Sequence, residues 1–256
     1  MKIELVRAPN PGPFTLDGTN SWVLSGRVVI DPGPSIASHV EALLERAGRL
    51  EKILVTHRHA DHAAAAIELA RRSGASLFAP EGVLSAHVAR GLVDGEVVAS
   101  VEGVDIRVIA TPGHTGEHVC FLGSEGDLFT GDTILGEGTT AIFPPDGHMG
   151  DYLASLAKLR ALEPKRIHPG HGPTREDALE LIDAYIAHRH ERERQILAAL
   201  EGRQRSLGEL RGRIYPDLPP ALHRGAEAQL TAHLIHLQEH GRVRILSGDF
   251  AVKVLS

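Results

Sequence analysis

The sequence predicts an α/β fold in which sheets are covered by helices, followed by a smaller helical module. Short apolar runs bounded by Gly and Pro indicate strands, helical patterns lie between them, and the pattern changes near Pro173. The 256 residues are enough for one large domain with an appendage. With 42% hydrophobic and 23% charged residues, the composition is that of an ordinary globular protein and excludes a disordered or fibrous one.

The first part of the chain is rich in strands. Helical spacing predicts helices over residues 36–47, 63–72 and 152–162, the last ended by Glu163-Pro164. The apolar runs predict strands over residues 21–24, 28–30, 53–56, 76–79, 104–110, 118–122 and 128–130.

The part after Pro173 has a different pattern. One long charged helix is predicted over residues 176–200, followed by shorter helical segments over 206–211 and 219–240. Strands over 242–246 and 250–254 flank the turn Ser247-Gly248-Asp249. Helices followed by a hairpin predict a winged-helix-like module. We therefore expect a catalytic domain of residues 1–175 and a C-terminal module of residues 176–256.

Charge and cysteine content narrow the class of protein. The net charge of -6 disfavours binding of nucleic acid by the molecule as a whole, although a local basic patch would still bind it. The single cysteine, Cys120, excludes an intramolecular disulfide and suits a reducing compartment. The first residues lack the apolar segment of a signal peptide, and no apolar run approaches ~18 residues. We expect a cytoplasmic protein that does not contact membranes.

The strongest chemical signal is the motif His57-Arg58-His59-Ala60-Asp61-His62, between a predicted strand and an Ala-rich helix. A turn from strand to helix can direct several of these side chains into one cavity, and imidazoles with a carboxylate suit Zn²⁺, Mn²⁺ or Fe²⁺. Three later segments repeat the pattern of a strand end followed by His or Asp beside Gly, at His114, Asp132 and His171. Each is weak alone, but together with the first motif they predict a metal site.

These residues, in this order, resemble the metallo-β-lactamase superfamily over about residues 17–173. The resemblance implies an αββα metallo-β-lactamase sandwich holding two divalent ions, with Zn²⁺ expected first and Mn²⁺ or Fe²⁺ as alternatives. It assigns His57, His59 and His114 to one ion, Asp61, His62 and His171 to the other, and Asp132 to both. Two cations about 3.5–4 Å apart supply a bridging hydroxide at neutral pH, so a hydrolase is expected, with catalytic roles for Asp61 and Asp132.

Three further residues have expected supporting roles. Asp31 follows a predicted strand and is expected to brace a ligand histidine, with a helix-cap role as the alternative. His118 alternates with strand residues and is expected to support the site without binding metal. Cys120 is expected to pack as a small apolar residue.

Segments 10–13, 16–20, 136–140 and 145–153, together with the winged-helix-like end, are similar to the lactamase-beta-two-like branch. That branch includes an endoribonuclease for single-stranded RNA and is similar to thioesterases that release polyketides from carrier proteins. The resemblance implies a metallohydrolase for single-stranded RNA, or alternatively a thioesterase or other ester hydrolase with glyoxalase-II-like chemistry. A β-lactamase or lactonase is less favoured, because lactamases with this first motif lack the bridging Asp and are secreted. A non-enzymatic scaffold that binds nucleic acid is least favoured.

The expected partners follow from these two activities. They are a small or carrier-bound ester or thioester, or single-stranded RNA, and a second copy of the chain in a homodimer is a further candidate. A nuclease needs a basic surface, for which the C-terminal module offers Arg203, Arg205, Arg211, Arg213, Arg224, Arg242 and Arg244.

Overall fold

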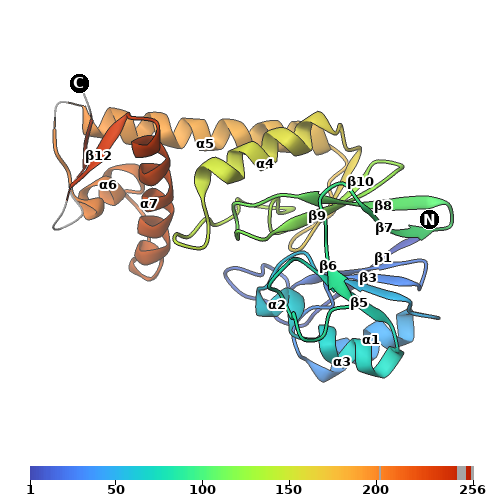
Figure 1. Ribbon diagram of the computed structural model, residues 1–256. Helices are drawn as coiled ribbons and strands as arrows, with labels where there is room; N and C mark the ends of the chain where they lie inside the picture. Colours follow the sequence, from blue (N-terminus) through green and yellow to red (C-terminus); the bar gives the residue numbers. More distant parts are fainter. Residues whose placement is uncertain (202, 247–251, 255–256) are drawn as a thin grey trace. The chain divides into compact units, whose positions relative to one another are not determined.

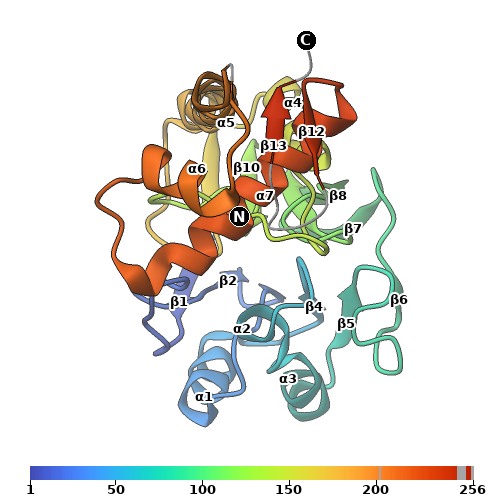
Figure 2. The same cartoon turned by 90° about the vertical axis from the view of Figure 1, so that its left-hand side faces the viewer.

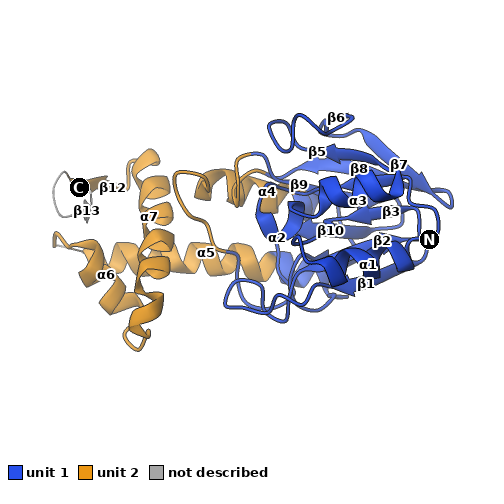
Figure 3. Cartoon of the chain, turned by 90° about the horizontal axis from the view of Figure 1, so that it is seen from below, with its two compact units in different colours: residues 1–111, 117–140, 159–182 blue, residues 112–116, 141–158, 183–256 orange. Residues whose placement is uncertain are grey.

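The structure of the protein is a computed structural model, and it describes residues 1–201, 203–246 and 252–254. Figure 1 shows the helices and strands of the chain. The chain forms two compact units that alternate along the sequence (Figure 3). Unit 1 contains residues 1–111, 117–140 and 159–182, and unit 2 contains residues 112–116, 141–158 and 183–256.

Two sheets face each other in unit 1. The six-stranded sheet has the order β1-β2-β3-β4-β5-β6, and the five-stranded sheet has the order β11-β10-β9-β8-β7. The first sheet consists of β1 Ile3–Arg7, β2 Asn20–Leu24, β3 Val28–Ile30, β4 Lys52–Leu54, β5 Ser76–Ala79 and β6 Arg90–Gly91. The second consists of β7 Val97–Val101, β8 Val104–Ala110, β9 Val119–Gly123, β10 Asp127–Gly131 and β11 Arg166–Pro169.

Side chains from both sheets form the core between them. Trp22, Leu54 and Phe78 of the first sheet pack in one cluster with Ile106 and Phe121 of the second. A separate cluster lies on the other face of the first sheet. This face is covered by the helices α1 Ala37–Arg46, α2 Ala60–Ala63 and α3 Ala66–Ser73 (Figure 1). The inner strands β2 to β5 are therefore buried on both faces, as their nearly continuous apolar sequences require.

The single helix predicted over residues 63–72 is instead two helices, α2 and α3. Gly33 causes the break: its N–H donates to the carbonyl of His62 at 3.0 Å, and its carbonyl accepts from the N–H of Ala65 at 3.1 Å. Both groups would otherwise form bonds inside one helix. The predicted helix over residues 36–47 is found as α1, to within one residue at each end.

Unit 2 contains the C-terminal helices. α4 Met149–Ala161 and α5 Ala178–Leu200 each run from one unit into the other, and α6 Leu207–Ile214, the short 3-10 helix Pro220–Leu222 and α7 His223–Glu239 follow. Ser206 and Glu209 form a reciprocal capping box at the start of α6. Leu230, Leu234 and Leu237 of α7 pack with Ile196 and Leu210 in a core within this unit.

A short hairpin follows α7, as expected for a winged-helix-like module (Figure 2). Its strands β12 Val243–Ile245 and β13 Val252–Val254 pair antiparallel. The predicted turn at Ser247-Gly248-Asp249, with Phe250, lies outside the described residues. No helix within the described part of the chain is long and apolar enough to cross a membrane.

Candidate metal centre

The first motif lies where the fold gathers strand ends. β3, β4 and β5 are parallel, so their carboxyl ends meet at one edge of the sheet. The loop from β4 to α2 carries His57 and His59 at this edge, and α2 carries Asp61 and His62. A four-residue helix places Asp61 and His62 in its first turn, close to the strand end.

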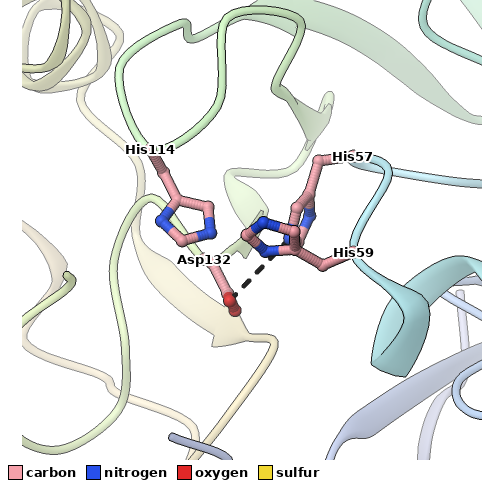
Figure 4. A group of neighbouring side chains, drawn as sticks. All are labelled: His57, His59, His114 and Asp132. Atoms are coloured by element: carbon pink, nitrogen blue, oxygen red, sulfur yellow. Dashed lines mark ion pairs between the residues drawn. The ribbon is translucent and has the colours of Figure 1, made fainter. Parts of the chain in front are cut away.

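The structure brings all seven predicted ligands into two groups. One contains His57, His59, His114 and Asp132 (Figure 4), and the other contains Asp61, His62 and His171. Within each group, one potential ligand atom per residue lies within 4.8 Å of the others. These are the two sets expected from the family pattern.

Asp132 faces both groups. Its Oδ1 lies 3.3 Å from Nε2 of His62 and 3.3 Å from Nε2 of His171, whereas its Oδ2 lies 3.8 Å from Nε2 of His57. One carboxylate oxygen is thus directed toward each set of histidines, which is the arrangement that a bridging ligand needs.

The second group forms a cluster of electron-pair donors. His62 directs Nδ1 to Asp31 at 2.8 Å, and His171 directs Nδ1 to the carbonyl oxygen of Gly18 at 3.3 Å. Because an oxygen faces Nδ1 of each ring, each ring presents Nε2 to the centre, and the two Nε2 atoms lie 3.2 Å apart. Asp61 Oδ2 lies 3.2 Å from Nε2 of His171 and 3.4 Å from that of His62. A cation satisfies all of these donors at once, so the residues fit a divalent metal ion.

The charges of the centre favour a cation as well. Burial alone opposes a charge on His62, but the carboxylates of Asp132 and Asp31 outweigh it and raise the pKa of the His62 imidazole well above its ordinary value. Burial also works to raise the pKa of Asp61, yet the hydrogen bond with His171 and the nearby His62 lower it overall. The site therefore stabilises positive charge among these carboxylates.

Asp31 supports the centre as the sequence predicts. Its carboxylate accepts hydrogen bonds from Thr56 N–H, from the Thr56 hydroxyl and from His62 Nδ1, each at 2.8 Å. Asp31 has a left-handed backbone with φ of 51°, a conformation that costs energy and that the three hydrogen bonds hold in place. Because the Thr56 hydroxyl donates to Asp31, it accepts from His57 Nδ1 at 2.9 Å. One carboxylate thereby orients two candidate ligands.

His118 holds the backbone beside Asp132. Its Nε2 accepts from Asp132 N–H at 3.2 Å, and its Nδ1 lies 3.0 Å from the Thr111 hydroxyl. A Cβ on Gly131 would lie 2.6 Å from the Thr56 hydroxyl and 2.8 Å from His118 Nε2. The turn that carries Asp132 is thus confined between Thr56 and His118, as the expected supporting role of His118 requires.

Cys120 adds a polar contact to the packing role expected for it. Its Sγ is fully buried and lies 3.3 Å from the Thr111 hydroxyl and 3.6 Å from the carbonyl oxygen of Thr130. The chain from His118 through Thr111 to Cys120 therefore contacts the backbone on both sides of Gly131.

Asn20 is a supporting residue to which the sequence analysis gives no role. Its side-chain amide donates to the carbonyls of Pro169 at 3.0 Å and Gly172 at 2.8 Å, on either side of His171. Trp22 Nε1 donates to the same Pro169 carbonyl at 3.1 Å. The signal that could have identified Asn20 is an amide at the start of a buried strand, because such a group needs partners.

Comparison with known proteins identifies the fold. Residues 14–171 match the model of the metallo-beta-lactamase superfamily, and residues 206–249 match that of the beta-lactamase associated winged helix domain. The family model therefore supports the predicted αββα fold class and the predicted C-terminal winged helix.

Curated relatives and solved structures cover most of the chain. A Beta-lactamase-like protein 2 homolog from Caenorhabditis elegans is 36% identical over 85% of this chain and 77% of its own length. The Atrochrysone carboxyl ACP thioesterase of Aspergillus fumigatus is 34% identical over 80% of this chain and 66% of its own length. A metallo-beta-lactamase family protein from Thermus thermophilus has the same fold, with a TM-score of 0.80 at 23% identity over 99% of this chain and 98% of its own. The chain belongs to the metallo-beta-lactamase superfamily and is a hydrolase of that fold.

Proposed function

We propose that this hydrolase uses two divalent ions, one held by His57, His59 and His114, the other by Asp61, His62 and His171, with Asp132 binding both. The convergence of Asp61, His62, His171 and Asp132, with two Nε2 atoms 3.2 Å apart, carries the proposal. Two such ions supply hydroxide at neutral pH and stabilise the negative charge that develops on the substrate oxygen.

The side chains around the ligands have defined tasks. Asp31 keeps the proton of His62 on Nδ1, and the Thr56 hydroxyl does the same for His57, so that both present Nε2 to the centre. The Thr19 hydroxyl lies 3.4 Å from Asp61 Oδ2. The Asp61 side chain is 28% exposed, so its carboxylate can accept a hydrogen bond from the attacking water and orient it.

The substrate that the comparisons favour is an acyl thioester. The thioesterase relative matches 80% of this chain, and the net charge of -6 does not favour a polyanionic substrate. Zn²⁺ is the ion we propose, because imidazole and carboxylate ligands suit it, with Mn²⁺ or Fe²⁺ as alternatives.

Single-stranded RNA is the second candidate substrate, and exposed arginines favour it. Arg203, Arg213, Arg224, Arg242 and Arg244 of the C-terminal module are exposed. Arg211 is paired with Glu227 at 2.8 Å, and Arg205 donates to the Ala199 carbonyl, so these two contribute less to a basic surface. A cytoplasmic location and a homodimer remain proposals that accompany either substrate.

The test is a parallel assay of the Zn²⁺-loaded and Mn²⁺-loaded protein with an acyl-pantetheine thioester, single-stranded RNA, a lactone and a β-lactam. We expect thioester hydrolysis that is abolished by a chelator and that hardly responds to salt. RNA cleavage as the main activity, weakening with salt by a log–log slope of about 0.7 per phosphate contacted, would favour the second candidate instead.

Asp132→Asn provides the matched variant, with Asp105→Asn on the exposed part of β8 as its control. We expect Asp132→Asn to remove most activity and to weaken metal binding, whereas Asp105→Asn keeps both. If Asp132→Asn hydrolyses the best substrate as fast as the parent protein, the proposed centre is wrong.

A further inference from the structure

A single peptide group connects helix α7 with His114. The Ala141 carbonyl oxygen lies 2.9 Å from His114 Nδ1, and the Ile142 N–H donates to the Gln229 side-chain oxygen, Oε1, at 2.9 Å. The carbonyl of residue 141 and the N–H of residue 142 belong to the same planar amide. That amide is thus hydrogen-bonded on one side to a candidate metal ligand and on the other to Gln229.

The core of unit 2 fixes the part of α7 that carries Gln229. Leu230, the next residue of α7, and Leu234, about one turn further along, are fully buried in the core of unit 2 with Leu210 and Ile196. Ile142 is fully buried too, so water is excluded from its side chain. Because that core fixes the position of α7, it also determines where the Gln229 oxygen can accept the hydrogen bond from the Ile142 N–H.

We propose that Gln229 is a positioning residue for His114, acting through the peptide between Ala141 and Ile142. The proposal rests on the assignment of His114 as a metal ligand in the proposed function. The Ala141 carbonyl accepts the Nδ1 proton of His114 and so directs Nε2 to the metal. Gln229 fixes the plane of that carbonyl and, by accepting from the same amide, polarises it toward the imidazole.

This arrangement gives the C-terminal module a part in metal binding that differs from substrate recognition. If the Gln229 oxygen is removed, the Ile142 N–H loses its acceptor and the peptide is free to rotate toward another one. The Ala141 carbonyl then turns with it, because both groups share one plane. The orientation of His114 becomes less defined, although no ligand has been changed.

The test compares two substitutions of similar size in the full-length protein. Gln229→Glu keeps an acceptor oxygen for the Ile142 N–H, whereas Gln229→Met removes it. Gln238→Met is the matched control, because Gln238 lies on the same helix and its Oε1 accepts from Ile245 N–H at 2.8 Å. The readouts are the affinity for Zn²⁺ and Co²⁺, by competition with a chelator, and the solvent exchange of the shifted histidine N–H protons in the Co²⁺ protein.

We expect Gln229→Met to weaken the binding of one equivalent of metal by about 3- to 30-fold, somewhat less than the ~10–100-fold typical for a direct partner of a ligand. One histidine N–H proton should also exchange faster with solvent. Gln229→Glu and Gln238→Met should bind metal within about threefold of the parent protein. Should Gln229→Met fail to fold, Gln229→Asn takes its place, since the shorter amide keeps the chemistry of the side chain but withdraws the acceptor.

Unchanged affinity in the variant that lacks the acceptor would overturn the proposal, and so would an equal loss in Gln229→Glu. Neither result concerns hydrolysis, so the proposal can fail while the hydrolase assignment stands. If the parent protein itself binds no divalent ion, the proposed two-metal function fails, and the role of His114 fails with it.

Discussion

At the scale of single residues, the structure shows which ring nitrogen faces an oxygen in four of the candidate ligands. His57, His62, His114 and His171 each direct Nδ1 to an oxygen, of Thr56, Asp31, Ala141 and Gly18 respectively. A neutral imidazole with its proton on Nδ1 has its lone pair on Nε2. The spacing of the motifs predicts which residues gather, but not these oxygens, because three of the four are remote in sequence from the histidine they orient.

A second buried pair, away from the metal centre, offers a test of how the protein responds to acid. His168 Nε2 lies 2.8 Å from Asp127 Oδ1, and Arg166 lies 3.1 Å from the same oxygen. The hydrogen bond to His168 is the main cause that lowers the pKa of Asp127 below its ordinary value of 3.8, against the opposing effect of burial. The ionised carboxylate therefore stabilises the folded protein above pH 3.8, and this contribution is lost as the pH falls through the lower folded-state pKa.

We predict that Asp127→Asn lowers the free energy of unfolding at pH 7 by about 1–3 kcal/mol, the range for a buried group that loses a charged partner. The difference from the parent protein should shrink as the pH falls below 3.8 toward the lower pKa of Asp127 in the folded protein. Urea unfolding at a series of pH values from acidic to neutral measures both. Glu41→Gln, which removes an exposed pair with Arg72, is the control and should change stability little. A difference that is constant with pH would show that the charge of Asp127 does not matter.

At the scale of elements, most strands and helices with regular apolar patterns are predicted, whereas the strands β1, β6, β7 and β11 are not. β3, β5 and β8 have the predicted bounds. β7 is not predicted, because a bulge between Val97 and Ala99 shifts the side chains and places Val98 and Ala99 both on buried positions. β6 has two residues, too few for any periodicity. The predicted fold class survives these omissions because it rests on the order of the longer elements.

The break between α2 and α3 depends on a contact that no local pattern shows. Gly33 lies far earlier in the chain, yet it takes the hydrogen bonds that would join the two helices. Its φ is +84°, and a Cβ there would lie 2.7 Å from His39 Nε2. The placement of His62 at the centre therefore depends on a glycine in another loop.

We predict that Gly33→Ala destabilises the protein by more than Gly74→Ala. Gly74 ends α3 at a similar φ of +76°, but a Cβ there meets nothing within 4 Å. Both substitutions introduce a backbone cost of about 1–3 kcal/mol, and only Gly33→Ala adds the collision with His39. Urea unfolding of both variants measures the difference. Equal losses of stability would mean that the contact with His39 relaxes without cost.

At the scale of the whole molecule, the sequence places a boundary at a single point, whereas the units alternate along the chain. A change of pattern near Pro173, visible in the sequence, precedes α5, which begins at Ala178. The membership of residues 112–116 and 141–158 in unit 2 is not visible, because it depends on contacts with residues far along the chain. One such contact places the Arg189 guanidinium 5.1 Å from the ring centre of Tyr152. The predicted boundary at residue 175 implies that residues 1–175 fold independently of the rest of the chain. This stays a prediction.

That boundary can be tested with two truncated proteins, one ending at residue 175 and one at residue 240. Met149, Tyr152 and Leu156 are fully buried and lie in a segment grouped with residues 183–256. The shorter protein keeps these three side chains but lacks residues 183–256 of unit 2. Burial of each side chain stabilises the folded state by about 1.5–3 kcal/mol. Their partial exposure would remove a large share of the roughly 5–15 kcal/mol typical of a domain.

We therefore expect the protein ending at residue 175 to unfold at lower urea concentration and to bind a dye specific for exposed apolar surface. The protein ending at residue 240 keeps α5, α6 and α7, including Arg189 and Gln229. It should unfold at the same urea concentration as the full chain and should not bind the dye. Cooperative unfolding of the shorter protein at the same urea concentration as the full chain, without dye binding, would instead establish residues 1–175 as a domain that folds alone. Metal binding separates the outcomes further, because the Ile142 N–H retains its Gln229 acceptor only in the longer protein.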